Sequence, residues 1–277
     1  MKDPQRPTAD PTMTVDQVKE LVTENEPGSF LLLDVRQPAE YEEIHIPGAR
    51  LIPLPELPDA IPRLDPTKPT VVYCAVGGRS RVAVQLLRGQ GFQRVFSMAG
   101  GIYAWEGLEA VGPRELNLDR VRGDESPQEM LILAYQMEHG LGRFYDTARV
   151  RAGDAKVVEL LTTLMDVEER HKRRLEQTYT ALTKEDLVES RASGLAGSDI
   201  MEGGFRMDEF MAQNQHFMDS QEKILEMAIM LESQALDLYL RFAEKMRHEA
   251  AREFLYGISQ EEKHHLAALG RLYDDIA

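Results

Sequence analysis

The sequence predicts two structural units: an α/β domain whose parallel sheet has helices on both faces, and then an all-α four-helix bundle. Three observations predict this division. Short apolar runs alternate with helical segments as far as residue 110. A stretch of mixed charge containing Gly112 and Pro113 follows. Beyond it come long helical periods rich in Glu, Leu, Met and Ala, with almost no strand signals. We therefore expect a disordered lead (1–12), an α/β domain (13–110), a linker (111–126) and the bundle (127–277).

Composition restricts the classes of function. The net charge is −15, and residues 113–277 hold 21 Lys and Arg against 32 Asp and Glu. Such an acidic surface argues against nucleic acid or an anionic membrane as a partner. No apolar run approaches about 18 residues and the N-terminus has no signal-peptide core, so we expect a cytoplasmic protein. The single cysteine excludes an intrachain disulfide and a metal site with four cysteine ligands.

The α/β pattern can be followed element by element. Thr14 suits the N-cap of a helix whose apolar residues fall on one face. The apolar run 30–35 suits a central parallel strand, and the proline-rich passage 53–66 suits a connection. We expect further strands at 70–73 and 94–97, a helix at 80–87 and a short helix near 102–105.

Cys74 stands where the strand 70–73 ends and the next helix begins. Gly77 and Gly78 predict a tight turn whose N–H groups form a nest for an anion, and the helix dipole adds positive potential. Arg79 and Arg81 add whole charges, so each contribution favours a reactive thiolate. A lone cysteine after a buried strand is also compatible with a small apolar core residue, but the Gly-Gly-Arg that follows favours the reactive site.

Residues 12–110 resemble a single-domain rhodanese. The resemblance is carried by Leu31 to Arg36, Glu40-Tyr41, His45 to Ala49, the Cys74 loop and Met98 to Trp105, in that order. The spacing Cys-x4-Arg from Cys74 to Arg79 is typical of rhodanese sulfurtransferases, whereas related phosphatases have Cys-x5-Arg. The resemblance implies that Cys74 takes sulfur from thiosulfate or a related persulfide and passes it to a thiol or cyanide. The residues expected to hold the anion are Ala75, Val76, Gly77, Gly78 and Arg79.

Asp34 and Arg36 follow a buried strand close to this loop. Charges in that place can contact substrate, but they more often pair with loop backbone and hold it still, and we favour the structural role. His45 is likewise expected to anchor a loop rather than to act as a base.

The second half of the chain repeats itself. Glu138 and Tyr145 are seven residues apart, as are Glu232 and Tyr239. Thirty residues after Glu138 comes Glu168-x-x-His171, and twenty-nine after Glu232 comes Glu261-x-x-His264. A long crossover, at about 183–220, separates the two copies.

The repeated pattern predicts a metal centre. Positions i and i+3 of a helix are neighbours, so a Glu and a His at that spacing can reach one metal ion. Glu138 and Glu232 each interrupt an apolar stripe, where an unpaired carboxylate is strongly unfavourable unless cations or hydrogen bonds meet it. If four glutamates and two histidines converge in the core of the bundle, two divalent metal ions bound there would explain why they are buried. Because a helix turns by about 100° per residue, we expect Glu262 and His265 to lie off the ligand face.

Residues 125–277 resemble the rubrerythrin branch of the ferritin-like di-iron proteins. The resemblance implies two iron ions, with manganese as an alternative, and Tyr145 and Tyr239 as hydrogen-bond donors to ligand carboxylates. The implied ligands are Glu138, Glu168, His171, Glu232, Glu261 and His264. Rubrerythrins carry a further glutamate where this chain has Ala235, and an iron site with four cysteines that this chain cannot supply, so electrons would come from another protein.

Two hypotheses of function follow. The first is a sulfurtransferase coupled to a di-iron bundle that reduces peroxide or oxygen. The second is a persulfide carrier or sensor without turnover, in which the bundle is a metal-binding scaffold for dimerisation. Ferritin-like bundles often pair through helix faces, so we expect a homodimer in either case.

Overall fold

The computed structural model describes residues 11–187, 200–214 and 220–276. The chain divides into two compact units between Leu116 and Asn117, inside the segment expected to be a linker. Among the described residues, no helix combines the length and the apolar character that a bilayer crossing requires.

The first unit is built on a five-stranded parallel sheet, which confirms the predicted α/β class. The strands are β1 (Thr12–Met13), β2 (Leu31–Asp34), β3 (Arg50–Leu51), β4 (Thr70–Tyr73) and β5 (Val95–Met98). Their order is β1-β5-β4-β2-β3, so β4 lies at the centre. Thr12, expected to end a disordered lead, instead pairs with Ser97 in β1, and residues 1–10 of that lead lie outside the described residues.

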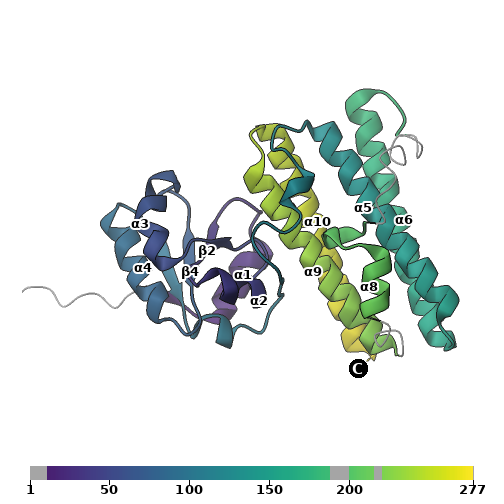
Figure 1. The fold of residues 1–277 in the computed structure, drawn as a ribbon, viewed down its shortest axis with the longest axis horizontal. Coiled ribbons are helices and arrows are strands. Elements are labelled where there is room, and N and C mark those ends of the chain that lie inside the picture. Colours follow the sequence, from purple (N-terminus) through teal and green to yellow (C-terminus); the bar gives the residue numbers. More distant parts are fainter. Residues whose placement is uncertain (1–10, 188–199, 215–219, 277) are drawn as a thin grey trace, which may run out of the picture. The chain divides into compact units, whose positions relative to one another are not determined.

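Helices cover both faces of this sheet (Figure 1). One face packs against α1 (Val15–Glu24) and α2 (Pro38–Glu43), and the other against α3 (Leu57–Ala60) and α4 (Gly78–Gly89). Alternate residues of each strand point to opposite faces, so Leu32 and Val71 belong to the first core while Leu33 and Val72 belong to the second. The short 3-10 helices η1 (Leu54–Glu56), η2 (Ile61–Arg63) and η3 (Gly101–Ala104) complete the unit.

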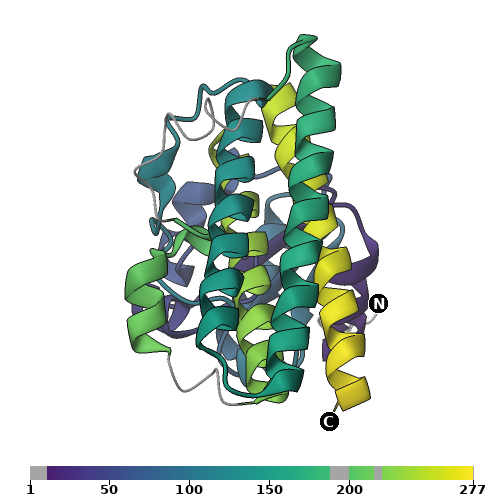
Figure 2. The same ribbon diagram turned by 90° about the vertical axis from the view of Figure 1, so that its right-hand side faces the viewer.

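The second unit is a bundle of four long helices, as the sequence predicts. They are α5 (Pro127–Arg151), α6 (Ala155–Thr183), α9 (Gln221–Lys245) and α10 (Glu249–Ile276), and Figure 2 shows them running side by side. The 3-10 helix η4 (Leu118–Arg120) belongs to this unit, because Lys245 Nζ donates a hydrogen bond of 2.6 Å to the carbonyl of Leu118. The second half of the expected linker is therefore packed onto the bundle.

The crossover between α6 and α9 is described in part. It contains the 3-10 helix η5 (Glu202–Gly204) and the helix α8 (Met207–Gln213). Of the predicted span 183–220, residues 188–199 and 215–219 lie outside the described residues. The described part brings η5 against α5 and α9, close to the middle of the bundle.

Candidate functional sites

Cys74 follows β4 at the carboxyl end of the sheet, where α4 begins. The backbone N–H of Gly77 donates a hydrogen bond to Cys74 Sγ at 3.1 Å, and the Ser80 hydroxyl oxygen lies 3.8 Å from the same sulfur. Burial raises the pKa of this thiol, but the N–H groups of Ser80, Gly77 and Val76 and the Ser80 hydroxyl outweigh burial and hold the pKa below its usual value. The loop therefore favours the thiolate, which is the nucleophilic form.

Local backbone geometry fixes the shape of this loop. Gly77 has a φ of +100°, which a side chain would strain, so the turn can bring its N–H toward the sulfur. Gly101, in the segment after β5, has no room for a side chain, because a Cβ there would lie 2.2 Å from the Cys74 carbonyl oxygen. That carbonyl instead accepts a 2.8 Å hydrogen bond from Ile102 N–H. The segment 99–104 thus packs against the backbone of the cysteine loop and holds it in place.

Ser80 is a site residue that the sequence analysis did not single out. Its side chain is fully buried, and its hydroxyl is 2.8 Å from that of Ser97 and 3.2 Å from the carbonyl oxygen of Gly77. These contacts hold the hydroxyl beside Sγ. The sequence could have indicated this residue, because Ser80 lies in the first turn of the helix that follows the cysteine loop.

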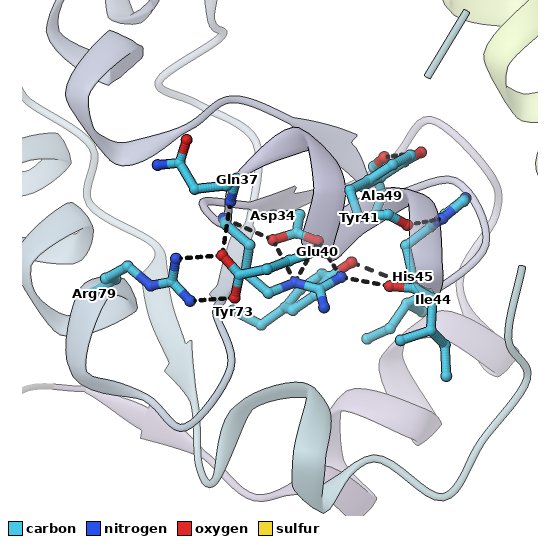
Figure 3. Close-up of polar contacts among 11 residues, drawn as sticks. Asp34, Gln37, Glu40, Tyr41, Ile44, His45, Ala49, Tyr73 and Arg79 are labelled. Carbon is cyan, nitrogen blue, oxygen red and sulfur yellow. Dashed lines mark hydrogen bonds and ion pairs between the residues drawn. The ribbon is translucent and has the colours of Figure 1, made fainter. Parts of the chain in front are cut away.

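Arg79 faces Glu40 (Figure 3). Two parallel hydrogen bonds of 2.7 and 2.6 Å join the guanidinium to the carboxylate, and both side chains are about one-third exposed. The guanidinium lowers the pKa of Glu40 to about 2. The pair is thus fully ionised above the ordinary carboxyl pKa and is lost only as the pH falls toward about 2. Arg79 also interacts with the Cys74 thiol, so an anion at Cys74 would share this cation with Glu40.

Asp34 and Arg36 form a buried ion pair in the structural role that we favour. The Arg36 guanidinium donates to both carboxylate oxygens at 2.7 to 3.0 Å, and it also donates to the carbonyl of Ile44 at 2.6 Å. His45 stacks on Tyr41 with 3.7 Å between ring centroids, and its Nδ1 lies 2.9 Å from the Tyr41 carbonyl. The first set ties the segment 36–49 to β2 through Asp34, and the second joins two residues within that segment (Figure 3).

In the bundle, two sets of three side chains converge on neighbouring points. One set comes from α5 and α6 and the other from α9 and α10; in each, the possible ligand atoms lie within 4.8 Å of one another. The first set is Glu138, Glu168 and His171, and the second is Glu232, Glu262 and His265. The rings of His171 and His265 stack with 3.7 Å between centroids, so the two sets are adjacent.

The second set corrects the sequence analysis by one residue. Glu261, expected as a ligand, instead forms a 2.9 Å ion pair with Arg174 near the surface, and His264 is exposed. Glu262 and His265, expected off the ligand face, point inward, with His265 Nδ1 3.1 Å from Glu262 Oε2 and 3.8 Å from Glu232 Oε2. The structure brings together the other four expected residues, Glu138, Glu168, His171 and Glu232.

The centre is rich in buried carboxyl groups. Burial raises the pKa of Glu138 well above its usual value, and the carboxylates of Glu202 and Glu168 raise it further. Glu168 Oε2 and Glu232 Oε2 are buried and form no hydrogen bond with the described residues, although an imidazole Nδ1 lies 3.3 Å from the first and 3.8 Å from the second. Carboxylate and imidazole donors around such orphaned oxygens fit a pair of divalent first-row metal ions, which would supply the missing positive charge.

The two tyrosines expected beside the ligands are both buried near this centre. Burial raises the pKa of Tyr145, and the carboxylates of Glu168 and Glu232 raise it further. Tyr239 donates a 3.1 Å hydrogen bond to Glu202, which was not among the expected ligands.

A thiol in a nest of amide groups on a parallel sheet, joined to a bundle with a doubled Glu and His cluster, defines a protein with one α/β sulfur-handling domain and one ferritin-like domain. Residues 14–108 match the rhodanese-like domain family and residues 223–277 match the rubrerythrin family.

The curated relatives match the first unit. A sulfurtransferase of Allochromatium vinosum is 39% identical over 85 residues, which are 30% of this chain and 79% of that protein. The thiosulfate sulfurtransferase GlpE of Pseudomonas syringae is 40% identical over 75 residues, 27% of this chain and 71% of that protein. A chloroplastic rhodanese-like/PpiC domain-containing protein of Arabidopsis thaliana is 39% identical over 97 residues, 32% of either chain, so this chain spans about a third of that relative. The chain thus belongs to the rhodanese-like family, with a rubrerythrin domain at its C-terminal end.

Proposed function

We propose that the first unit is a sulfurtransferase that carries sulfur as a persulfide on Cys74. The Cys74 thiolate attacks the outer sulfur of thiosulfate, a new sulfur–sulfur bond forms, and sulfite leaves with the electron pair of the broken bond. A thiolate or cyanide then attacks the terminal sulfur of the persulfide and regenerates the Cys74 thiolate. The observation that carries this proposal is the 3.1 Å contact between Gly77 N–H and Sγ, in a loop that lowers the pKa of the thiol.

The loop also suits the charge of the substrate. The Gly77 N–H already donates to Sγ, and donors placed in advance stabilise charge without reorganisation. Arg79 supplies a cation that Glu40 neutralises in the free protein. The donor class that fits is a small dianion with a sulfane sulfur, and the name of the Pseudomonas syringae relative supports thiosulfate.

The test is direct because Cys74 is the sole cysteine. The full chain is incubated with thiosulfate, and intact mass spectrometry is expected to show the addition of one sulfur atom, which cyanide removes. The Cys74→Ser variant is expected to show neither the adduct nor thiosulfate sulfurtransferase activity. Full activity in that variant would refute the proposal. A stable adduct without steady-state turnover would favour the carrier or sensor hypothesis.

We also propose that the bundle holds two divalent metal ions, iron in the first instance and manganese as the alternative. Glu138, Glu168 and His171 would hold one, and Glu232, Glu262 and His265 the other. Bound iron would supply redox chemistry toward peroxide or oxygen. The protein's own part is to hold the ions in a dry interior, and a partner protein would supply electrons because the chain has no cluster of cysteines.

Metal analysis of the full chain tests this second part, and the corrected register provides the control. Glu262→Gln is expected to lower the metal content, whereas Glu261→Gln is expected to leave it at the wild-type value because Glu261 is paired with Arg174. Equal loss in both variants would contradict the assignment. Absence of iron and manganese from wild-type protein after anaerobic loading would remove the metal centre from the proposal.

A further inference from the structure

Glu202 enters the bundle from the crossover and not from any of the four long helices. It begins η5 and its side chain is fully buried. Met201 N–H donates a 2.8 Å hydrogen bond to the Phe205 carbonyl, and Gly203 adopts a φ of +70°, so the chain turns sharply just after Glu202. This turn directs the carboxylate toward the middle of the bundle.

The Glu202 carboxylate lies between the two sets of expected ligands. One of its oxygens is within 4.8 Å of ligand atoms of Glu138 and Glu262, which belong to different sets. Its Oε1 accepts the 3.1 Å hydrogen bond from Tyr239, while its Oε2 is buried with no hydrogen-bond donor among the described residues. One oxygen is therefore oriented by a tyrosine and the other is available.

A purely structural role does not account for this arrangement. A carboxylate that merely filled space would be expected to have both oxygens satisfied, because a buried unpaired polar atom is unfavourable. Here the chain places a fifth carboxyl group against four others in a buried centre, where burial and repulsion between carboxylates oppose its ionised form. A cation shared with Glu138 and Glu262 would relieve that repulsion.

We propose that Glu202 is a seventh ligand of the metal centre, contributed by the crossover, and that it binds a divalent first-row metal ion through Oε2. This inference rests on the proposed metal centre. Tyr239 positions the Glu202 carboxylate by donating a hydrogen bond to Oε1.

The experiment compares Glu202→Gln with Glu209→Gln in the full chain. Glu209 is a matched control because it lies in the same crossover, in α8, and is 65% exposed. Apo-protein is titrated anaerobically with Fe²⁺, and in parallel with Mn²⁺, to obtain the number of ions bound and their affinities. The apo-protein melting temperature is measured beside them, because Gln keeps an acceptor for Tyr239 and is a neutral side chain of nearly the same shape.

For Glu202→Gln we expect at least one ion to bind about 10-fold to 100-fold more weakly, with no fall in the apo melting temperature. Glu209→Gln should match the wild type. Two ions bound with wild-type affinity by Glu202→Gln would overturn this inference and leave the metal centre intact, whereas a wild-type chain that binds no metal would overturn both. If Glu202→Gln fails to fold, Glu202→Asp decides: it keeps the charge but withdraws the oxygens, so unchanged affinity there would refute ligation.

Discussion

Gly140 offers a sharp test of how the crossover is seated on the bundle. This glycine lies in α5, and the backbone of the crossover passes directly over it. A Cβ at Gly140 would lie 2.0 Å from the carbonyl oxygen of Ile200 and 3.1 Å from Cα of Met201. Real Cβ atoms almost never come closer than 3.0 Å, so in Gly140→Ala the crossover backbone has to move by about 1 Å.

Gly142, two residues further along the same helix, is the matched control. A Cβ there would meet only Glu168 Cβ, at an ordinary 3.5 Å. Each Gly→Ala change should stabilise the helix by about 1 kcal/mol. The close approach at Gly140 should cost about 1–3 kcal/mol, as overpacking of a filled core does. Since the helix contribution is common to both variants, Gly140→Ala should be less stable than Gly142→Ala by about 1–3 kcal/mol.

The assay is urea unfolding of the metal-free full chain. Helical circular dichroism reports mainly on the bundle, while the fluorescence of Trp105, the sole tryptophan, reports on the α/β unit. The loss of stability should appear in the circular dichroism transition and not in the fluorescence transition. If Gly140→Ala is at least as stable as Gly142→Ala, the crossover does not lie against α5 as described and the argument for Glu202 loses its geometry.

Three further predictions concern the α/β unit. Ser80→Ala should raise the pKa of the Cys74 thiol, so the pH at which its alkylation by iodoacetamide reaches half-maximal rate should move upward; an unchanged profile would show that the loop amides alone set that pKa. Asp34→Asn should lower the unfolding free energy of the unit by about 3–5 kcal/mol, followed by tryptophan fluorescence, because it leaves a buried guanidinium without its carboxylate; a change below 1 kcal/mol would contradict this. Glu40→Gln should lower the KM for thiosulfate by up to about 5-fold with little change in kcat, since it frees Arg79 from an exposed ion pair, whereas a higher KM would mean that Glu40 positions the cation.

The α/β unit was predictable because its signals are local. The run from Thr70 to Tyr73 forms β4 with the same bounds that the sequence suggests, since four consecutive buried positions require an apolar or β-branched residue at each. Thr14 caps α1 through reciprocal hydrogen bonds with Gln17, a pattern legible at a spacing of three. Thr12 was misjudged because its pairing with β5 depends on a segment 85 residues away.

The metal ligands on α10 were misjudged although the sequence held enough information. The run from Glu261 to His265 contains two overlapping Glu-x-x-His patterns, and a shift of one residue turns the side chains by about 100°. The buried residues Leu255, Ile258, Leu266 and Leu269 lie seven, four, four and seven residues from Glu262, which places Glu262 and not Glu261 on the inward stripe. The interval of thirty residues from Glu138 to Glu168 also recurs from Glu232 to Glu262.

Glu202 differs from that case because no periodicity points to it. It begins a 3-10 helix of only three residues, and its position depends on contacts made by residues far apart in sequence: the Tyr239 hydroxyl from α9 and the bare backbone of Gly140 in α5. In the sequence, each of these two residues looks ordinary for a helix: a buried tyrosine in α9 and a glycine in α5. They become informative together, because the glycine admits the crossover and the tyrosine orients the carboxylate that it carries. A carboxylate that a connection between helices brings into the centre is therefore found from the structure and not from sequence spacing.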